Sequence, residues 1–142
     1  MMIKRRLTTA ALGVAASGVL IVATAGAAHA AGTSASRTGV SVSAYWDWSA
    51  NSLTNVDYTV RDTDCDGNDV YGRMRVYTKL VPDGTDTTKR YNSSGCDTKV
   101  TYSDLKFEAT NHITGLRLYA CVNDAGADSC TRSSFIDNPK VD

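Results

Sequence analysis

One short segment places aromatic and basic side chains at every second position: Tyr71, Arg73, Arg75, Tyr77 and Lys79. In an extended strand, residues two apart lie on the same face, so these side chains would form one stripe. Tyrosine and arginine are enriched among the residues that carry binding energy at protein interfaces. We expect this stripe to bind a protein partner. The alternative is a solvated sheet face whose arginines pair with aspartates on the neighbouring strand.

The densest aromatic stretch is residues 45–48, with the sequence Tyr-Trp-Asp-Trp. Trp46 continues an alternation of apolar residues that begins at Val40, so core packing is its more ordinary role. Trp48 comes where the strand is expected to end, before the polar residues 49–52, and we expect it to be exposed. Trp46 and Trp48 are therefore added to the expected partner-binding residues.

A second segment carries oxygen ligands at the spacing of a calcium-binding loop. Asp62, Asp64 and Asp66 fall at ligand positions of such a loop, and Gly67 falls where the loop needs a glycine. The last position should be a glutamate that binds through both oxygens, and this chain has Arg73 there. The more ordinary interpretation is an acidic turn, and we predict no metal or other cofactor.

Residues suited to catalysis are scarce. His112 is the single histidine beyond residue 30, and it lies between Asn111 and Ile113 in an expected turn. No Gly-x-Ser-x-Gly motif supplies a nucleophile. Paired carboxylates can be proposed in any Asp-rich chain, but most of these aspartates fall in turn segments. We therefore expect a protein that is not an enzyme.

The four cysteines predict two disulfides. No two of them are close enough in sequence for a zinc site, and an even number in an exported chain indicates disulfides. Residues 123–128 indicate a turn. A hairpin centred on that turn places Cys121 opposite Cys130 at a non-hydrogen-bonded position, where Cα atoms approach to about 4.5 Å. This leaves Cys65 to pair with Cys96.

The N-terminus has the organisation of an export signal. Residues 1–9 carry three positive charges, residues 10–26 are small and apolar, and residues 28–30 are Ala-His-Ala, which a signal peptidase can read. We predict a signal peptide of residues 1–30 and a secreted protein with no membrane association after cleavage. Residues 31–38 are small and polar, and we expect a flexible N-terminal arm there.

The exported part is slightly acidic. Residues 31–142 hold 12 basic and 15 acidic residues, a net charge of −3. A nucleic-acid partner is not expected, because binding nucleic acid needs a concentrated positive surface. We expect one or more extracellular proteins as partners.

Beyond the arm, apolar residues alternate with polar ones in short runs separated by turn residues. Fourteen of the fifteen acidic residues are aspartates, which favour turns over helices. We predict one all-β domain over residues 39–142, a two-sheet antiparallel sandwich of the Ig-like or Greek-key type with two disulfides. The hairpin register also places Phe135 opposite Leu116. The expected core is Val40, Val42, Trp46, Val56, Tyr58, Val60, Val70, Met74, Val76, Leu105, Phe107, Leu116, Leu118, Val122 and Phe135.

The Lys-Arg-Arg start, the Ala-rich export segment and the small disulfide-bonded β domain resemble secreted actinobacterial proteins. The size, the lack of a catalytic set and the expected arm are similar to the adaptor subunit of umbrella toxin particles, which links a lectin-like propeller to a helical-repeat stalk. Tendamistat-type amylase inhibitors are also two-disulfide sandwiches, but this chain has Trp46-Asp47-Trp48 where they have Trp-Arg-Tyr. Neocarzinostatin-type carriers have a similar length and two disulfides, but they lack a charged, Tyr-bearing segment such as residues 71–79.

These expectations combine into a secreted, non-catalytic binding protein, an adaptor in an extracellular complex that the resemblance would make a toxin particle. Its contacts would come from residues 71–79, from Trp46 to Trp48 and from residues 31–40. The alternative is an inhibitor of a secreted hydrolase, an amylase or a protease. A disulfide-braced loop such as 65–71 or 92–96 would then block the active site, because a rigid loop loses little entropy on binding.

Overall fold

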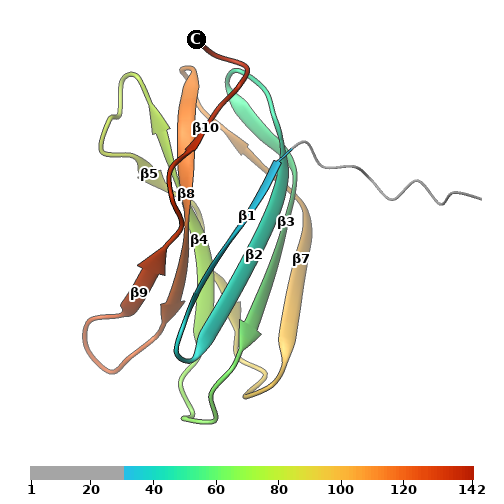
Figure 1. The fold of residues 1–142 in the computed structure, drawn as a ribbon, viewed down its shortest axis with the longest axis vertical. Helices are drawn as coiled ribbons and strands as arrows, with labels where there is room; N and C mark the ends of the chain where they lie inside the picture. The colour runs from blue at the N-terminus through green and yellow to red at the C-terminus, as the bar shows by residue number, and fades with distance from the viewer. Residues whose placement is uncertain (1–30) are drawn as a thin grey trace, which may run out of the picture.

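The computed structural model describes residues 31–142, and the expected signal peptide lies outside the described residues. Figure 1 shows an elongated all-β domain. In this range there is no helix, and so none that is long and apolar enough to cross a membrane. The strands are β1 (Ala31–Arg37), β2 (Val40–Trp48), β3 (Ser52–Asp62), β4 (Val70–Thr78), β5 (Thr85–Asp86), β6 (Arg90–Asn92), β7 (Lys99–Glu108), β8 (Ile113–Val122), β9 (Ser129–Arg132) and β10 (Ile136–Asp137).

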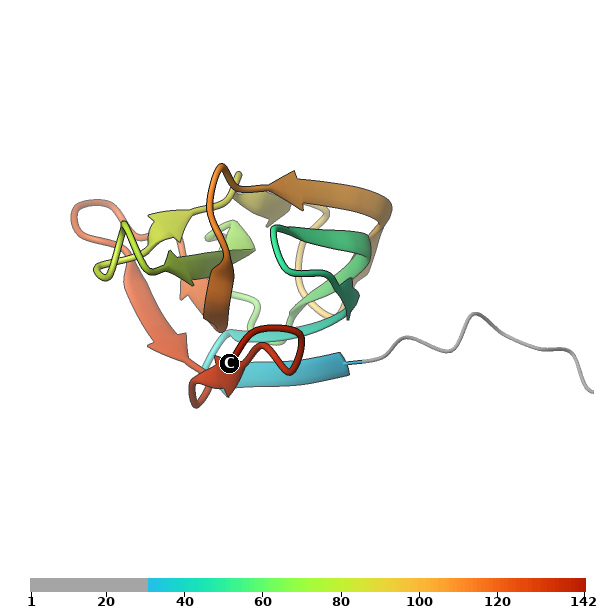
Figure 2. The same cartoon turned by 90° about the horizontal axis from the view of Figure 1, so that it is seen from above.

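The strands form two antiparallel sheets that face each other (Figure 2). Sheet 1 has the order β1-β2-β3-β7, and sheet 2 has the order β10-β8-β4-β5, with β6 also paired to β4 and β9 also paired to β8. The chain crosses between the sheets from β3 to β4, returns from β6 to β7 and crosses again from β7 to β8, so that β7 lies beside β3 and β8 beside β4. These paired crossovers are those of an immunoglobulin-type Greek key. The prediction of an all-β, two-sheet antiparallel sandwich is confirmed.

Alternation along the strands places the apolar side chains between the sheets. Most of the expected core is buried there, together with Leu53, Ile113 and Ala120, which the sequence analysis did not include. Leu105 and Phe107 are only half-buried against this core. The two sheets come close where β4 passes β2, because Gly72 has no side chain. A Cβ atom at Gly72 would lie 2.7 Å from Val42 Cγ1, nearer than two carbons can approach.

The expected flexible arm is wrong, because residues 31–37 form strand β1. All seven residues pair with β2, from Ala31 opposite Trp46 to Arg37 opposite Val40. A two-residue turn joins the strands, and its Gly39 has a φ of 93°, a conformation open to glycine. A small, polar composition did not prevent pairing, since the pairing uses backbone groups and the turn residue favours a hairpin. The folded domain therefore includes residues 31–38.

Phe135 is also placed differently from the prediction. Strands β8 and β9 keep the predicted register, but β10 is shifted by one residue, so that Ile136 lies opposite Leu116. In the irregular segment between β9 and β10, Ser133 pairs with Leu118 through its backbone N–H and its hydroxyl. A shift of one residue turns each following side chain to the other face. Phe135 is consequently 36% exposed on the outside of sheet 2, and half-buried Ile136 packs against the core instead.

Both predicted disulfides are present. Cys121 and Cys130 lie directly opposite each other in the β8–β9 hairpin with Cα atoms 4.1 Å apart. Cys65 and Cys96 join the loop after β3 to the loop after β6, with a Cα separation of 4.7 Å. Two disulfides and no free cysteine among residues 31–142 fit an oxidising, extracellular setting.

Candidate partner-binding face

The outward-facing side chains of β4 form the centre of the predicted stripe. Val70, Met74 and Val76 face the core, so the intervening residues from Tyr71 to Tyr77 face away from it, as the alternation predicted. Lys79 lies just beyond the end of β4 and is exposed. The stripe is not uniform, however. Its side chains differ in exposure and in what covers them.

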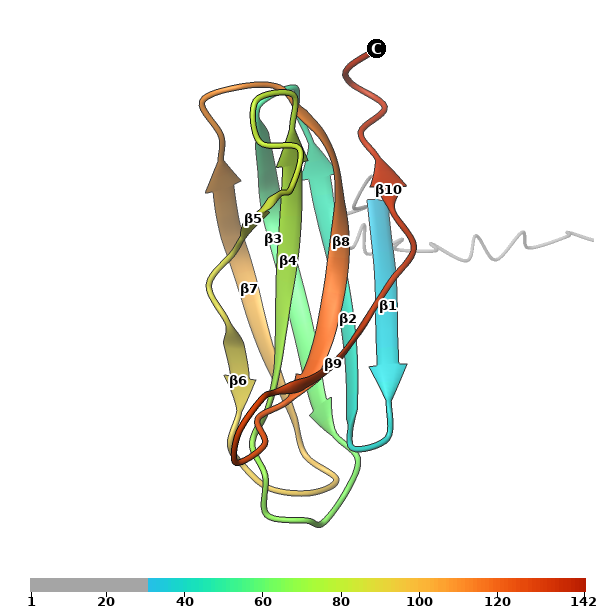
Figure 3. The ribbon, with the colours of Figure 1, turned by 90° about the vertical axis from the view of Figure 1, so that its left-hand side faces the viewer.

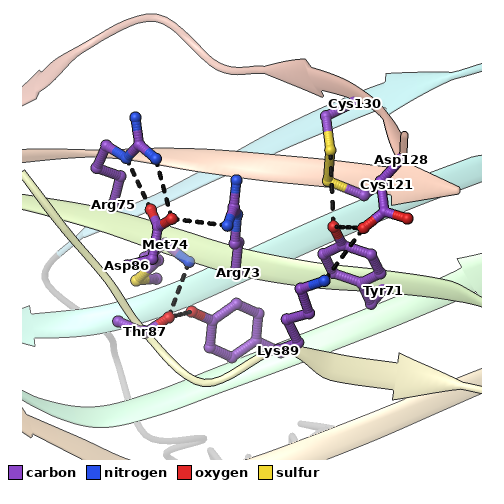
Figure 4. Close-up of polar contacts among 11 residues, drawn as sticks. Tyr71, Arg73, Met74, Arg75, Asp86, Thr87, Lys89, Cys121, Asp128 and Cys130 are labelled. Atoms are coloured by element: carbon purple, nitrogen blue, oxygen red, sulfur yellow. Dashed lines mark hydrogen bonds and ion pairs between the residues drawn. A yellow bond between two sulfur atoms is a disulfide. The ribbon is translucent and has the colours of Figure 1, made fainter. Parts of the chain in front are cut away.

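Tyr71 is covered almost completely, with 1% of its surface exposed. Its ring lies 5.1 Å from the Tyr91 ring, and the Lys89 ammonium lies 4.4 Å above it. The Tyr71 hydroxyl donates a hydrogen bond of 2.7 Å to Asp128, which also accepts one of 3.1 Å from Lys89 (Figure 4). Cys130 Sγ is 3.8 Å from the same hydroxyl. The expectation that Tyr71 is available to a partner is therefore wrong.

The network around Tyr71 shifts the pKa values of its members. Hydrogen bonds from Tyr71 and then Lys89 hold the pKa of Asp128 below its usual value. Burial, followed by the bond to Asp128, raises the pKa of Tyr71. The hydrogen bond to Asp128 is the main cause that raises the pKa of Lys89. All three shifts favour the charge states that the network uses, a carboxylate, an ammonium and a neutral phenol.

At the middle of the face, two arginines share one carboxylate. Arg73 donates to Asp86 at 2.6 Å, and Arg75 donates at 2.7 Å and 2.9 Å to its two oxygens (Figure 4). Asp86 belongs to β5 and lies opposite Arg75 in the strand register. Both guanidinium groups also lie over the Tyr119 ring, at 5.2 Å and 5.5 Å. The bond from Arg75 is the main cause that lowers the pKa of Asp86. This is the cross-strand pairing that the sequence analysis gave as its alternative.

The other end of the face is open. The rings of Tyr77 and Phe135 meet edge to face at 5.3 Å, and the Arg117 guanidinium lies 5.7 Å over Phe135. Phe135 fits there because Gly115 lies beneath it, where a Cβ atom would overlap the ring. The adjoining loop between β4 and β5 exposes Leu80 by 74% and Val81 by 42%. We call these five side chains the Tyr77–Phe135 patch: Tyr77, Phe135, Arg117, Leu80 and Val81.

The expected exposure of Trp48 is wrong. Trp46 is fully buried, Trp48 is 7% exposed, and their rings meet edge to face at 5.5 Å within the core. Strand β2 continues through Trp48, which pairs with Leu53 at the start of β3. The alternation that buries Trp46 therefore buries Trp48 as well, and neither ring is available to a partner in this fold.

The acidic loop after β3 uses its side chains to shape turns. Asp62 accepts a hydrogen bond from the backbone of Asp64, and Asp66 accepts bonds from the backbone and the side-chain amide of Asn68. These bonds to Asn68 lower the pKa of Asp66. Among residues 31–142, no three His, Cys, Asp or Glu residues are grouped as metal ligands would be. The interpretation as an acidic turn describes the loop.

Several residues of this face were missed by the sequence analysis. Tyr119 and Arg117 alternate along β8 just as Tyr71 and Arg73 do along β4, so the same period-two pattern could have identified them. Asp86 and Phe135 gave no such signal, because Asp86 lies in a two-residue strand and Phe135 lies in the irregular segment between β9 and β10. Comparisons with protein-family models, with curated proteins and with solved structures found no match.

Proposed function

We propose that this chain is a secreted, non-catalytic protein that binds another extracellular protein through the Tyr77–Phe135 patch. The observation that carries the proposal is an aromatic pair, half-buried Tyr77 and 36% exposed Phe135, held beside an arginine on the outside of a disulfide-bonded sandwich. Aromatic and arginine side chains dominate the binding energy of protein interfaces. Strands β4 and β8 hold Tyr77 and Arg117 in place, so little further entropy is lost on binding.

The role is that of an adaptor, in a multi-subunit complex such as a toxin particle. An adaptor needs a second surface, and sheet 1 offers one. Tyr45 on β2 is 50% exposed, and its ring lies over Gly32 of β1, where a Cβ atom would overlap it. Tyr45 and the Tyr77–Phe135 patch belong to different sheets of the sandwich, so two partners can bind without competing for the same residues.

The test is affinity capture of the tagged protein from the culture supernatant of its producer, with mass spectrometry of the bound proteins. The variants are Phe135→Ser and Tyr45→Ser, with Lys140→Ser as an exposed control. An adaptor predicts two partners, one lost with Phe135→Ser and the other with Tyr45→Ser, each by about tenfold or more. Circular dichroism checks that each variant is folded. Unchanged capture by the folded Phe135→Ser variant would reject the patch.

The alternative function, an inhibitor of a secreted amylase or protease, is favoured by the Cys65–Cys96 end of the molecule. That disulfide braces two exposed loops, residues 63–69 and 93–98, against each other. A braced loop suits insertion into an active site. An inhibitor predicts a single captured hydrolase that loses activity in proportion to added protein. In that case Ser94→Lys in the braced loop weakens capture, and Phe135→Ser does not.

A further inference from the structure

A pocket opens between the two sheets, away from the Tyr77–Phe135 patch. It has a volume of about 190 Å³ and lies between β3 and β7 of sheet 1 and the β4–β6 region of sheet 2. Figure 3 shows β5, β6 and β7 along the same side of the molecule. The apolar residues that line it are Leu53, Val56, Met74, Leu105 and Phe107.

The pocket has the size for a small aromatic molecule. An apolar cavity of about 150 Å³ lined by Leu, Ile and Phe stays dry and binds benzene. This pocket is larger, and one side is open where Leu105 and Phe107 of the edge strand β7 are only half-buried. A single ring would not fill it, whereas a flat molecule of two fused rings would reach from the apolar floor to the opening.

Two hydroxyl groups provide polar contacts inside the pocket. Tyr58 is 3% exposed, and its hydroxyl has a long contact of 3.4 Å to Thr87 Oγ1 and also interacts with the Met74 backbone. Thr87 Oγ1 already accepts a hydrogen bond of 3.0 Å from the Met74 backbone. Burial raises the pKa of Tyr58 to about 12, so its hydroxyl keeps its proton and can donate a hydrogen bond to an acceptor in the pocket. The nearby positive charge of Arg90 acts in the opposite direction.

The charges at the opening favour an anion. Arg90 and Lys106 line the pocket, and Asp86 is the one carboxylate among its lining residues. Arg73 and Arg75 already hold Asp86 on the outer face of sheet 2. Lys106 pairs with exposed Glu108 at the surface, whereas Arg90 makes no ion pair among residues 31–142 and lies over the Tyr102 ring at 5.6 Å. The unpaired positive charge beside the pocket is therefore that of Arg90.

We propose that this pocket binds a small, flat aromatic carboxylate. Its rings lie against Leu53, Met74 and Phe107, and its carboxylate lies at the opening beside Arg90, within reach of the Tyr58 hydroxyl. This activity is independent of protein binding through the Tyr77–Phe135 patch, since the two sites share no residue. The chain would thus hold a small ligand as well as a protein partner.

The experiment titrates 2-naphthoate into the isotope-labelled protein, residues 31–142, and follows amide and methyl NMR signals. With about 13 non-hydrogen atoms, a ligand of ordinary efficiency has a Kd of about 1 mM or below. The expected result is saturable shifts confined to the signals of Leu53, Val56, Met74 and Leu105. The neutral analogue 2-naphthalenemethanol should bind about fivefold to tenfold more weakly.

Two variants, each with a matched control, separate binding in the pocket from nonspecific binding. Leu105→Trp should fill the pocket and abolish the shifts, and Ser103→Trp on the same strand, outside the lining, should not. Arg90→Gln should weaken naphthoate about tenfold and leave the neutral analogue unchanged, with Arg61→Gln as the matched loss of charge elsewhere. If Leu105→Trp unfolds the domain, Thr88→Trp at the opening replaces it.

Three results would overturn the proposal. The first is the absence of saturable shifts at ten millimolar naphthoate, a concentration roughly tenfold above the expected Kd. The second is binding of naphthoate that persists in a folded pocket-filling variant. The third is equal affinity for the charged and the neutral compound. The first two reject the pocket as a ligand site, and the third rejects its preference for an anion. None of them affects protein capture by Phe135, so a failure here is distinct from a failure of the adaptor function.

Discussion

The two ends of the outward face of β4 differ in their exposure to solvent. Tyr71 and Tyr77 are both tyrosines of β4 and both point away from the core, yet Tyr71 is 1% exposed and Tyr77 remains part of an open aromatic patch. Tyr71 is covered by the Tyr91 ring of the neighbouring strand β6, by the Lys89 side chain and by the Asp128 carboxylate at the turn of the β8–β9 hairpin. Tyr77, in contrast, is only half-buried, and it contacts the Phe135 ring and Gly84 of the loop between β4 and β5.

Alternation along a strand therefore decides which side of the sheet a side chain lies on, but not how exposed it is on that side. A second layer of side chains closes the Tyr71 end, and a disulfide fixes part of that layer. The Tyr71 end therefore has a structural role, and the protein binding that we propose involves the Tyr77 end.

The largest expected contrast is between Tyr71→Ala and Tyr77→Ala. Removing the buried Tyr71 ring leaves a cavity, and it should lower the free energy of unfolding by about 3 kcal/mol. Tyr77→Ala should cost about 1 kcal/mol or less, because the lost ring is partly exposed. Urea unfolding of the two variants measures the contrast. Equal losses in the free energy of unfolding would contradict the distinction between a closed end at Tyr71 and an open end at Tyr77.

The Cys121–Cys130 disulfide should be the next largest contribution to the closed end. The bridge spans nine residues, and replacing both cysteines with alanine should lower stability by about 2.5 kcal/mol through the entropy of the unfolded chain. Because the bridge holds the hairpin over Tyr71, amide exchange should also accelerate in residues 129–132.

The other disulfide is the control for that experiment. Replacing Cys65 and Cys96 with alanine should also destabilise the domain, but it should leave the exchange of residues 129–132 unchanged relative to global unfolding. Equal acceleration by both pairs would mean that the Cys121–Cys130 bridge has no local role at the closed end.

The sequence predicted the features that depend on neighbours along the chain. A period of two and one turn predict the two-sheet fold, the Cys121–Cys130 pairing and the outward direction of alternate residues from Tyr71 to Tyr77. Alternation and hairpin register depend on residues close in sequence, and they hold where the strand is long and the turn is short. Even the burial of Trp48 follows from the same period, once β2 is continued to its observed end.

The features that failed depend on which distant segments meet. Burial of Tyr71 needs Lys89, Tyr91 and Asp128, none of which is close to it in sequence. The exposure of Phe135 needs the one-residue shift before β10, which has no turn signature. The pocket between β7 and the β4–β6 region needs both sheets at once. Contacts of this kind are set by tertiary packing, so local patterns did not contain them.

At the open end, Gly115→Ala should cost about 1 to 2 kcal/mol, since the added methyl group would overlap the Phe135 ring and the Ile136 carbonyl oxygen. A double-mutant cycle with Phe135→Ala measures their coupling. Removing the ring should lessen the cost of Gly115→Ala. Strictly additive effects would contradict the placement of Phe135 over Gly115.

The smallest expected effects come from the two carboxylates that pair with this face, Asp86 at its middle and Asp128 at its closed end. Their pKa values lie below the ordinary range, mainly because of the hydrogen bonds from Arg75 and from Tyr71 respectively. With a depressed pKa in the folded state, each carboxylate stabilises the fold above the unfolded pKa of about 4, and that contribution is lost as the pH falls through the folded value.

Asp86→Asn and Asp128→Asn should therefore both reduce stability at pH 6, and both deficits should shrink by pH 3. For Asp86 the deficit at pH 6 should stay below about 1 kcal/mol, as for other partly exposed ion pairs. Lys89→Met should weaken the pH dependence that Asp128 contributes and leave that of Asp86 nearly intact, because Lys89 bonds to Asp128. If the stability deficit of the Asn variants persisted unchanged at pH 3, the loss would come from the different hydrogen bonding of the amide group. The charge of the carboxylate would then not stabilise this face.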